Sequence, residues 1–389
     1  MRVYLDYNAT APLRPEVVAC VAAASAPGFG NPSSLHAEGR AARALLEESR
    51  ASIAERLGAA SSELVFTSGG TEANRLAIFG VLSARRARGG LPSGAHAVVS
   101  VIEHASVRDL YQQLERDEGL SISWIPAGTD GRAQSDDAAG LVRAETLIVS
   151  LQHSNNETGV LQPLSPLAAA CRKLRVPLHC DAVQSLGKVP IDLRTLGADL
   201  VTFSGHKLGG PKGVGALWTR RGTPFKAPHS GGPQEAGLRP GTEALPAVAG
   251  FDLALELSER AAPDLAALRD RLWSRISGEI PSAVRNGDPA WVLPNTLNIS
   301  IPTVSAEMLL IQLDLAGVAA SQGAACASGA RKSSHVLQGM GLAPERVASA
   351  VRLSLGWATT PEEIERAATA FTAAVRAVSA PSRAPVRSP

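Results

Sequence analysis

Short apolar runs alternate with helical patterns from about residue 60 to residue 219, and this alternation constrains the fold more than any other feature of the chain. The pattern predicts strands at residues 63–66, 97–101, 121–125, 147–151, 176–180, 199–203 and 215–219, and helices at residues 71–86, 106–115 and 165–175. Such alternation is typical of a mostly parallel sheet covered on both faces, with ligands bound beyond the carboxyl ends of the strands. The sequence therefore predicts an α/β fold with its site at that edge of the sheet.

The pattern changes after about residue 247. It predicts one long amphipathic helix over about 250–280, a strand at 296–301, a helix at 307–315, a strand at 351–355 and a last helix from residue 361. We interpret this part as a second, smaller α+β domain. The expected organisation is an N-terminal segment (1–14) that packs with the small domain, a large ligand-binding domain (15–248), the small domain (249–380) and a flexible tail (381–389).

Composition and termini exclude several classes of protein. A hydrophobic fraction of 45% in 389 residues excludes a disordered or fibrous chain. A net charge of +2 and 4% aromatic residues give no case for binding nucleic acid or an anionic membrane. The first residues form no signal peptide, and no apolar run approaches the roughly 20 residues of a membrane span. The four cysteines fit neither a disulfide framework nor a zinc site, so we expect a cytoplasmic protein without a bound metal.

The turn from Thr67 to Thr71 follows the first predicted strand and opens a helix. Small residues and free amides at a helix N-terminus suit a phosphate group, although an ordinary glycine-rich turn has the same appearance. Neither the P-loop pattern nor the dinucleotide-binding pattern of glycines occurs here.

Two other strand ends carry candidate chemical groups. Asp181 ends one apolar run, with Gln184 three residues later, and it is either the partner of a protonated ring nitrogen or a helix N-cap. Lys207 follows another strand in the sequence Ser-Gly-His-Lys and is a candidate Schiff-base lysine. Lys212, in the glycine-rich loop that follows, is interpreted as a surface residue.

One histidine and one cysteine are candidates for catalysis. His104 follows the strand at 97–101 and is as compatible with a structural as with a catalytic role. Cys326 lies in a loop of Gly, Ala and Ser residues, where a thiol adds little packing and suits a nucleophile that must move. Cys20, Cys171 and Cys180 fall in helical or buried-strand patterns and are interpreted as core-filling thiols.

Taken together and in order, these blocks resemble the class V aminotransferase group of fold-type I pyridoxal-phosphate enzymes, and within it the cysteine desulfurases of the NifS/IscS kind. The resemblance rests on blocks in family order from residue 4 to about 360: Tyr4-Leu-Asp-Tyr-Asn-Ala-Thr10, Phe29-Gly-Asn-Pro-Ser-Ser-Leu-His36, Asn155-Asn-Glu-Thr-Gly159, His179-Cys-Asp-Ala-Val-Gln184, Ser204-Gly-His-Lys207, Arg239-Pro-Gly-Thr-Glu243, Asn295-Thr-Leu-Asn-Ile-Ser300 and Val351-Arg-Leu-Ser-Leu-Gly356. Any one block is weak, whereas the ordered set is very specific.

The resemblance implies a cofactor, pyridoxal 5′-phosphate, and a role for each candidate residue. Lys207 would bind the cofactor covalently, Asp181 would pair with its ring nitrogen, Gln184 with its phenolic oxygen, and His104 would stack on the ring and help to move protons. The phosphate would be held by Gly70, Thr71, Ser204 and His206, and by Thr242 of the neighbouring subunit in a homodimer. Asn156 would touch cofactor and substrate, and Arg352 would bind the substrate carboxylate. The implied reaction converts L-cysteine to L-alanine and leaves the sulfur on Cys326 as a persulfide for an acceptor protein.

Some positions depart from the family pattern. Ala residues replace the usual Ser residues on both sides of Cys326, Leu208-Gly-Gly replaces Ile-Tyr-Gly, Ala236 replaces a basic residue, and Trp357 stands where Arg is common. None removes a catalytic group. Transamination or selenocysteine cleavage is the rival reaction, and a silent scaffold for a sulfur acceptor is the rival outside enzymes. The acceptor stays open between iron–sulfur cluster assembly, nitrogenase maturation and tRNA thiolation.

Overall fold

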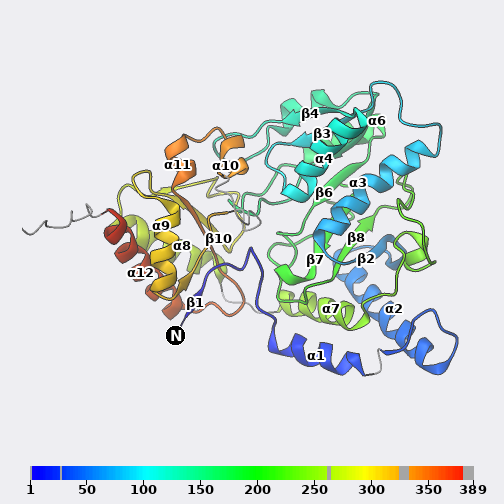
Figure 1. Ribbon diagram of the computed structural model, residues 1–389, viewed down its shortest axis with the longest axis horizontal. Helices are drawn as coiled ribbons and strands as arrows, with labels where there is room; N and C mark the ends of the chain where they lie inside the picture. The colour runs from blue at the N-terminus through cyan, green and yellow to red at the C-terminus, as the bar shows by residue number, and fades with distance from the viewer. Residues whose placement is uncertain (1, 27–28, 261–263, 324–332, 380–389) are drawn as a thin grey trace, which may run out of the picture.

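The computed structural model describes residues 2–26, 29–260, 264–323 and 333–379. Figure 1 shows two parts, a larger one on the right and a smaller one on the left, with the N-terminal segment passing from one to the other. The predicted α/β fold with a mostly parallel central sheet is confirmed.

The larger part is built on a seven-stranded sheet in the order β2-β8-β7-β6-β5-β3-β4. Only β8 runs antiparallel to its neighbours; the other adjacent strands are parallel. The strands are β2 (Leu64–Thr67), β3 (His96–Ser100), β4 (Ser121–Ile125), β5 (Thr146–Ser150), β6 (Leu178–Asp181), β7 (Leu200–Ser204) and β8 (Gly215–Thr219).

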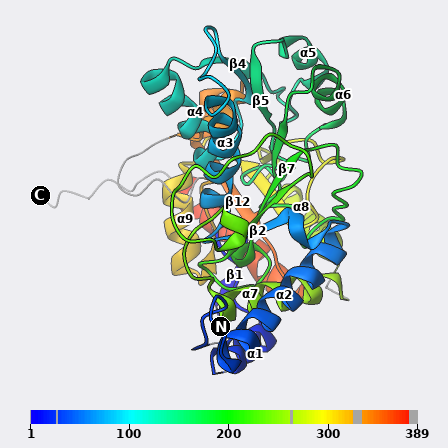
Figure 2. The ribbon, with the colours of Figure 1, turned by 90° about the vertical axis from the view of Figure 1, so that its right-hand side faces the viewer.

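Helices cover both faces of this sheet because successive side chains of a strand point to opposite faces. One face packs with α3 (Gly70–Arg86) and α4 (Ala105–Glu118). The other packs with α2 (Ala37–Leu57), α6 (Ser165–Leu174) and α7 (Leu245–Glu259). Helix α1 (Pro15–Ser25) lies on the outside of α7, and the short α5 (Ser135–Ala138) lies near α6 (Figures 1 and 2). Two-sided burial explains why the inner strands are rich in apolar residues, whereas the edge strand β4 is partly exposed and alternates apolar with polar residues.

The smaller part has its own core. An antiparallel sheet in the order β12-β10-β9 packs with helices α8, α9 and α12. The elements of this part are α8 (Leu265–Glu279), β9 (Val284–Arg285), β10 (Thr296–Ser300), α9 (Ala306–Leu315), β11 (Val318–Ala319), α10 (His335–Gly339), α11 (Pro344–Ala348), β12 (Ala350–Ser354) and α12 (Pro361–Ser379).

The N-terminal segment joins the two parts. Strand β1 (Val3–Tyr4) pairs in parallel with β11, and Val3 and Leu5 are buried in the core of the smaller part. The chain then crosses to the larger part, where the amide of Ala11 donates to the carbonyl of His206 at 2.9 Å. Residues 6–10 consequently run beside the end of β7.

The single helix predicted over 250–280 is wrong: two helices, α7 and α8, take its place. The leucine spacing continues across both helices, but Pro263 between them has no backbone N–H and is unfavourable inside a helix. Asp264 caps α8 by accepting from the amide of Ala267 at 3.0 Å. The domain boundary expected after residue 248 falls inside α7, whose buried residues on both sides of that point belong to the core of the larger part.

Within the described part of the chain, no helix is both long and apolar enough to cross a membrane. In the same ranges, no cluster of three or more His, Cys, Asp or Glu residues could hold a metal ion.

Candidate active site

A cavity of about 240 Å³ lies where the carboxyl ends of β2, β3, β6 and β7 face the smaller part. Ten of the twelve predicted site residues line it: Gly70, Thr71, His104, Asn156, Asp181, Gln184, Ser204, His206, Lys207 and Arg352. Thr242 is exposed and lies away from the cavity lining. Cys326 lies outside the described residues, although Gly323, shortly before it, is on the cavity wall.

The turn between β2 and α3 forms one end of the cavity. Gly69 has φ +151° and ψ −177°, a conformation that only glycine adopts readily. A Cβ on Gly70 would lie 2.7 Å from Cγ2 of Val183, so a side chain does not fit there either. The first amides of α3 have no partner within the helix, and together with Ser204 and His206 they make this end suitable for a phosphate group.

Asp181, the last residue of β6, is held by two hydrogen bonds. Its Oδ2 accepts from Nδ2 of Asn74 at 2.7 Å, and its Oδ1 accepts from the amide of Val183 at 2.9 Å. No helix begins after Asp181, so the alternative of a helix N-cap is not what the structure shows. The carboxylate is buried and faces the cavity, as a partner for a protonated ring nitrogen must.

His104 is the N-cap of α4. Its Nδ1 accepts from the amide of Ser106 at 3.1 Å, so the neutral ring carries its proton on Nε2. Burial lowers the pKa of His104, while Asp181 opposes that effect. Asn74 donates both to Ser106 Oγ (2.9 Å) and to Asp181, and thereby links the histidine to the carboxylate. The side chain therefore caps a helix and also lines the cavity.

Lys207 ends a short 3₁₀ turn, Gly205–Lys207, that follows β7. Its Nζ donates to the carbonyls of Asn8 and Ala9, both at 2.8 Å. The N-terminal segment therefore helps to fix the position of the amine in the cavity. Lys212, expected at the surface, is exposed.

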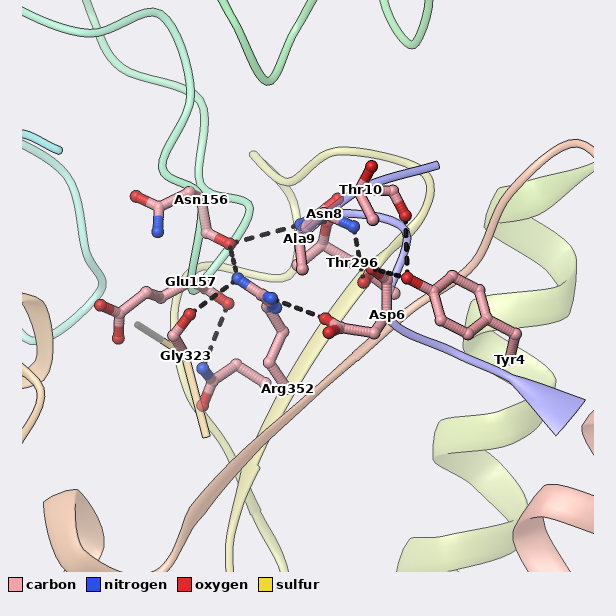
Figure 3. A network of polar contacts seen from close by, with 12 residues as sticks. Tyr4, Asp6, Asn8, Ala9, Thr10, Asn156, Glu157, Thr296, Gly323 and Arg352 are labelled. Atoms are coloured by element: carbon pink, nitrogen blue, oxygen red, sulfur yellow. Dashed lines mark hydrogen bonds and ion pairs between the residues drawn. The ribbon is translucent and has the colours of Figure 1, made fainter. Parts of the chain in front are cut away.

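Arg352, on β12, reaches the cavity from the smaller part and is almost fully buried (Figure 3). Its Nη2 lies 2.7 Å from Oδ1 of Asp6, and its Nη1 donates to the carbonyls of Asn156 (2.8 Å) and Gly323 (2.9 Å). Nε has no hydrogen-bond partner among the described residues. The guanidinium group is therefore fixed in orientation, with one buried donor unused.

Glu157 lines the cavity and lies close to Gly323 (Figure 3). Its Oε2 accepts from Ser334 Oγ at 2.5 Å, and a Cβ on Gly323 would lie 2.5 Å from the same oxygen. Burial raises the pKa of Glu157, whose Oε1 has no partner among the described residues. One carboxyl group thus contacts the chain just before and just after residues 324–332.

The segment that carries Thr242 is held to the phosphate end of the cavity from outside. Arg239 pairs with Glu72 in the first turn of α3 at 2.8 Å. Glu235, at φ +48°, forms a buried bidentate pair with Arg50 at 2.7 and 2.8 Å. Thr242 itself is exposed at the surface.

Several cavity residues were not predicted from the sequence: Asn8, Asn74, Gln152, Glu157 and His335. Asn74 offered a signal, because a polar residue on the otherwise apolar buried face of α3 requires a partner. Asn8 and Glu157 lie within two of the blocks that carry the resemblance, which gave them no role, and Gln152 and His335 lie outside those blocks. Of the thiols interpreted as core-filling, Cys171 and Cys180 are buried, whereas Cys20 is only partly so.

Comparison with known proteins identifies the family. The model of the class V aminotransferases matches residues 3–367. The chain belongs to this family. It is 43% identical to a cysteine desulfurase of Cereibacter sphaeroides over 369 residues, 94% of this chain and 93% of that protein. It is 38% identical to the cysteine desulfurase IscS of Dictyoglomus turgidum, over 93% of this chain and 91% of that protein.

Comparison with solved structures supports the same family. A NifS-like protein superposes with a TM-score of 0.88 at 31% identity, covering 96% of this chain and 99% of that one. A NifS-like protein of Rickettsia africae has a TM-score of 0.83 at 32% identity, with the same coverage. The resemblance to this group and the fold-type I architecture are confirmed.

Enzymes of this family and the cysteine desulfurases use pyridoxal 5′-phosphate. The cavity fits this cofactor in three ways: the first amides of α3 and a glycine, Gly70, without room for a Cβ at the phosphate end, a buried carboxylate at Asp181, and a lysine amine at Lys207. When bound, the cofactor supplies an electron sink for the Cα carbanion of an amino acid.

Proposed function

We propose that the chain is a pyridoxal-phosphate-dependent cysteine desulfurase that converts L-cysteine to L-alanine and delivers the sulfur through a persulfide on Cys326. The observation that carries the proposal is the meeting of Lys207, Asp181 and Arg352 in one cavity, whose wall includes Gly323, three residues before Cys326. A transaminase does not require a thiol there.

Each residue has a separate task. Arg352 binds the substrate carboxylate, a task for which a guanidinium is suited, after its present contacts rearrange. The amine of Lys207 accepts the Cα proton. Asp181 would hold a positive charge at the ring nitrogen, and Asn74 and the amide of Val183 fix its carboxylate. Gln184 would donate to the phenolic oxygen, and His104 would stack on the ring and help to move protons.

Sulfur transfer takes place at the thiol. The thiolate of Cys326 attacks the substrate sulfur; a sulfur–sulfur bond forms as the bond between that sulfur and Cβ breaks, and the released three-carbon fragment takes up protons to give alanine. The persulfide sulfur then passes to an acceptor protein, for iron–sulfur cluster assembly or a related thio-cofactor pathway.

The functional unit that we propose is a homodimer. Thr242 is exposed at the surface in a segment tied to the phosphate end by Arg239 and Glu72, and this placement supports contact with the cofactor phosphate of a second copy. For the domains we propose residues 15–260 and 264–379, with the N-terminal segment shared between them, because α7 belongs to the core of the larger part.

A product assay tests the proposed function. Purified protein with cofactor and L-cysteine should form alanine and, with a reductant, an equal amount of sulfide. Lys207→Ala should fold normally but carry no adduct that borohydride can reduce. The absence of alanine with the wild-type protein, or a reducible adduct in Lys207→Ala, would overturn the assignment.

A further inference from the structure

Lys188 is a second lysine beside the cavity, and none of the roles described above uses it. It lies in the turn after β6 and is half-buried. Nζ donates to Oε1 of Gln184 at 2.8 Å and to Oδ1 of Asn8 at 3.0 Å. Lys188 forms no ion pair with any residue in the described ranges, so two amide oxygens are the acceptors that hold its charge.

The contact between Nζ of Lys188 and Oε1 of Gln184 determines the orientation of the Gln184 amide. An ammonium group can only donate hydrogen bonds, so the oxygen of the amide must face Lys188. The nitrogen is then on the other side, where Nε2 donates to the carbonyl of Asn8 at 3.0 Å. An amide nitrogen has two N–H donors, and Gln184 lines the cavity, so the second donor remains for a ligand.

The side-chain amide of Asn8 is likewise oriented by hydrogen bonds, with its oxygen facing Lys188. Its Oδ1 accepts from Lys188 and from Nδ2 of Asn295 at 3.0 Å, and its own Nδ2 donates to Thr296 Oγ1 at 2.9 Å. The carbonyl of Asn8 accepts from both Gln184 and Lys207. Lys188 and Lys207 therefore share Asn8 as a common neighbour, and their charges repel each other at short range.

The charged groups that act on Lys188 are themselves positive. Burial lowers the pKa of Lys188, and the nearby cations Lys207 and Arg352 lower it further. Lys188 in turn is one of the groups that, after burial, lower the pKa of His206. Arg352 is compensated by Asp6, whereas Lys188 has no carboxylate partner of its own in the described structure.

We propose that Lys188 is a positioning residue that turns the donor end of the Gln184 amide toward the phenolic oxygen of the cofactor and, through its charge, favours the uncharged form of the nitrogen on Lys207. The proposal rests on the proposed function. Both influences favour loss of the proton that the Lys207 nitrogen and the phenolic oxygen share. Loss of Lys188 should remove both influences, so this proton should be held more tightly.

The test is a pH titration of the visible absorbance of the holoenzyme. Lys188→Met, which is of similar length but has neither donor nor charge, should move the titration midpoint upward by about 1 pH unit. Gln184→Ala should move it in the same direction, and the double variant should move it by less than the sum of the two, because the residues act partly through one another. Lys173→Met, an exposed lysine on α6, is the matched control and should leave the midpoint unchanged.

Lys188→Gln keeps the test decisive if Lys188→Met does not fold. Its amide can still donate to Gln184 but carries no charge, so its upward shift should be smaller than that of Lys188→Met, and about half a pH unit if charge and orientation contribute equally. An unshifted midpoint in the lysine variants, or strictly additive shifts in the double variant, would overturn the inference. If the midpoint does not shift but the wild-type holoenzyme forms alanine, the inference about Lys188 fails and the proposed function stands. If the wild-type protein has no cofactor absorbance and forms no alanine, the proposed function itself fails.

Discussion

Asp6 and Arg352 are separated by 346 residues in the chain, yet the carboxylate of Asp6 lies 2.7 Å from Nη2 of Arg352. The pair joins the N-terminal segment to β12 of the smaller part (Figure 3). Lys207 and Arg352 line the same cavity. Because Arg352 is nearly inaccessible to solvent, its guanidinium needs a counter-charge, and among the described residues Asp6 is the carboxylate that forms an ion pair with it. The N-terminal segment is therefore part of the site.

The first prediction concerns the stability that this pair provides. Asp6→Asn retains an oxygen acceptor but removes the negative charge, which leaves the buried guanidinium uncompensated. We expect the free energy of unfolding to fall by about 2 kcal/mol, below the range for breaking a fully buried pair because Asp6 is partly exposed. Urea unfolding at neutral pH measures the change. Asp314→Asn is the control, since its pair with Arg2 is well exposed and its loss should be small; equal losses in the two variants contradict the prediction.

The regular part of the fold was predictable because its signals are local. Most strands of the large sheet are apolar runs, and the helices between them have apolar residues at helical spacing. Helices α1 and α2 precede the alternating strands and helices, with no strand between them, so the alternation does not reveal these two helices. The break between α7 and α8 was missed because the leucine spacing continues through it, even though Pro263 marks it.

The site was predictable to the extent that its residues end strands. His104, Asp181, Ser204 and Lys207 each follow an apolar run, and parallel strands bring their carboxyl ends to one edge. The supporting residues could not be predicted, because their roles come from partners far away in the chain. Asn74 lies 107 positions from Asp181 and Lys188 lies 180 positions from Asn8.

The second prediction is a pH dependence of stability that originates at Glu103. This carboxyl group is fully buried; its Oε1 accepts from the amide of Gln152 at 2.7 Å, and its Oε2 has no partner among the described residues. Burial raises the pKa of Glu103 to about 8. Between the ordinary glutamate value and pH 8, the folded protein therefore binds a proton that the unfolded chain does not, and stability falls as pH rises through this interval.

The measurement is the free energy of unfolding of the wild type and of Glu103→Gln from pH 5 to pH 8. The wild type should lose stability relative to the variant by up to about 1.4 kcal/mol per pH unit. Above pH 8 the difference should become constant. Glu115→Gln, at an exposed position of α4, should run parallel to the wild type. A constant difference between Glu103→Gln and the wild type across the whole interval would show that Glu103 is not protonated in the folded state.

The third prediction separates cofactor binding from turnover at Asp181. Asp181→Asn keeps the size of the side chain but has no negative charge to hold a protonated ring nitrogen, so the cofactor should bind while alanine formation falls roughly 100-fold. Cofactor content from absorbance and initial rates with L-cysteine measure the two effects. Asp199→Asn is a matched control at the opposite end of the sheet, where the carboxylate pairs with Arg220. It should keep near-normal turnover; an active Asp181→Asn would refute the role of the carboxylate.

The fourth prediction is that Cys326→Ser stops sulfur transfer and leaves the earlier chemistry in place. Lys207, Asp181 and Gln184 act on the cofactor and on Cα, and all three lie on the described wall of the cavity. Cys326 acts on sulfur alone. A serine hydroxyl is close in size to a thiol but ionises far less near neutral pH, so it is a poor nucleophile toward sulfur.

The variant should therefore bind cofactor, and its visible spectrum should change when L-cysteine is added, as that of the wild type does. Alanine should not accumulate, and alkylation followed by mass spectrometry should find no persulfide at position 326. Cys20→Ser, at a partly buried position of α1 outside the cavity lining, should form alanine at the normal rate. If Cys326→Ser forms alanine as fast as the wild type, the thiol does not act on sulfur, and the chain is a class V enzyme with another reaction.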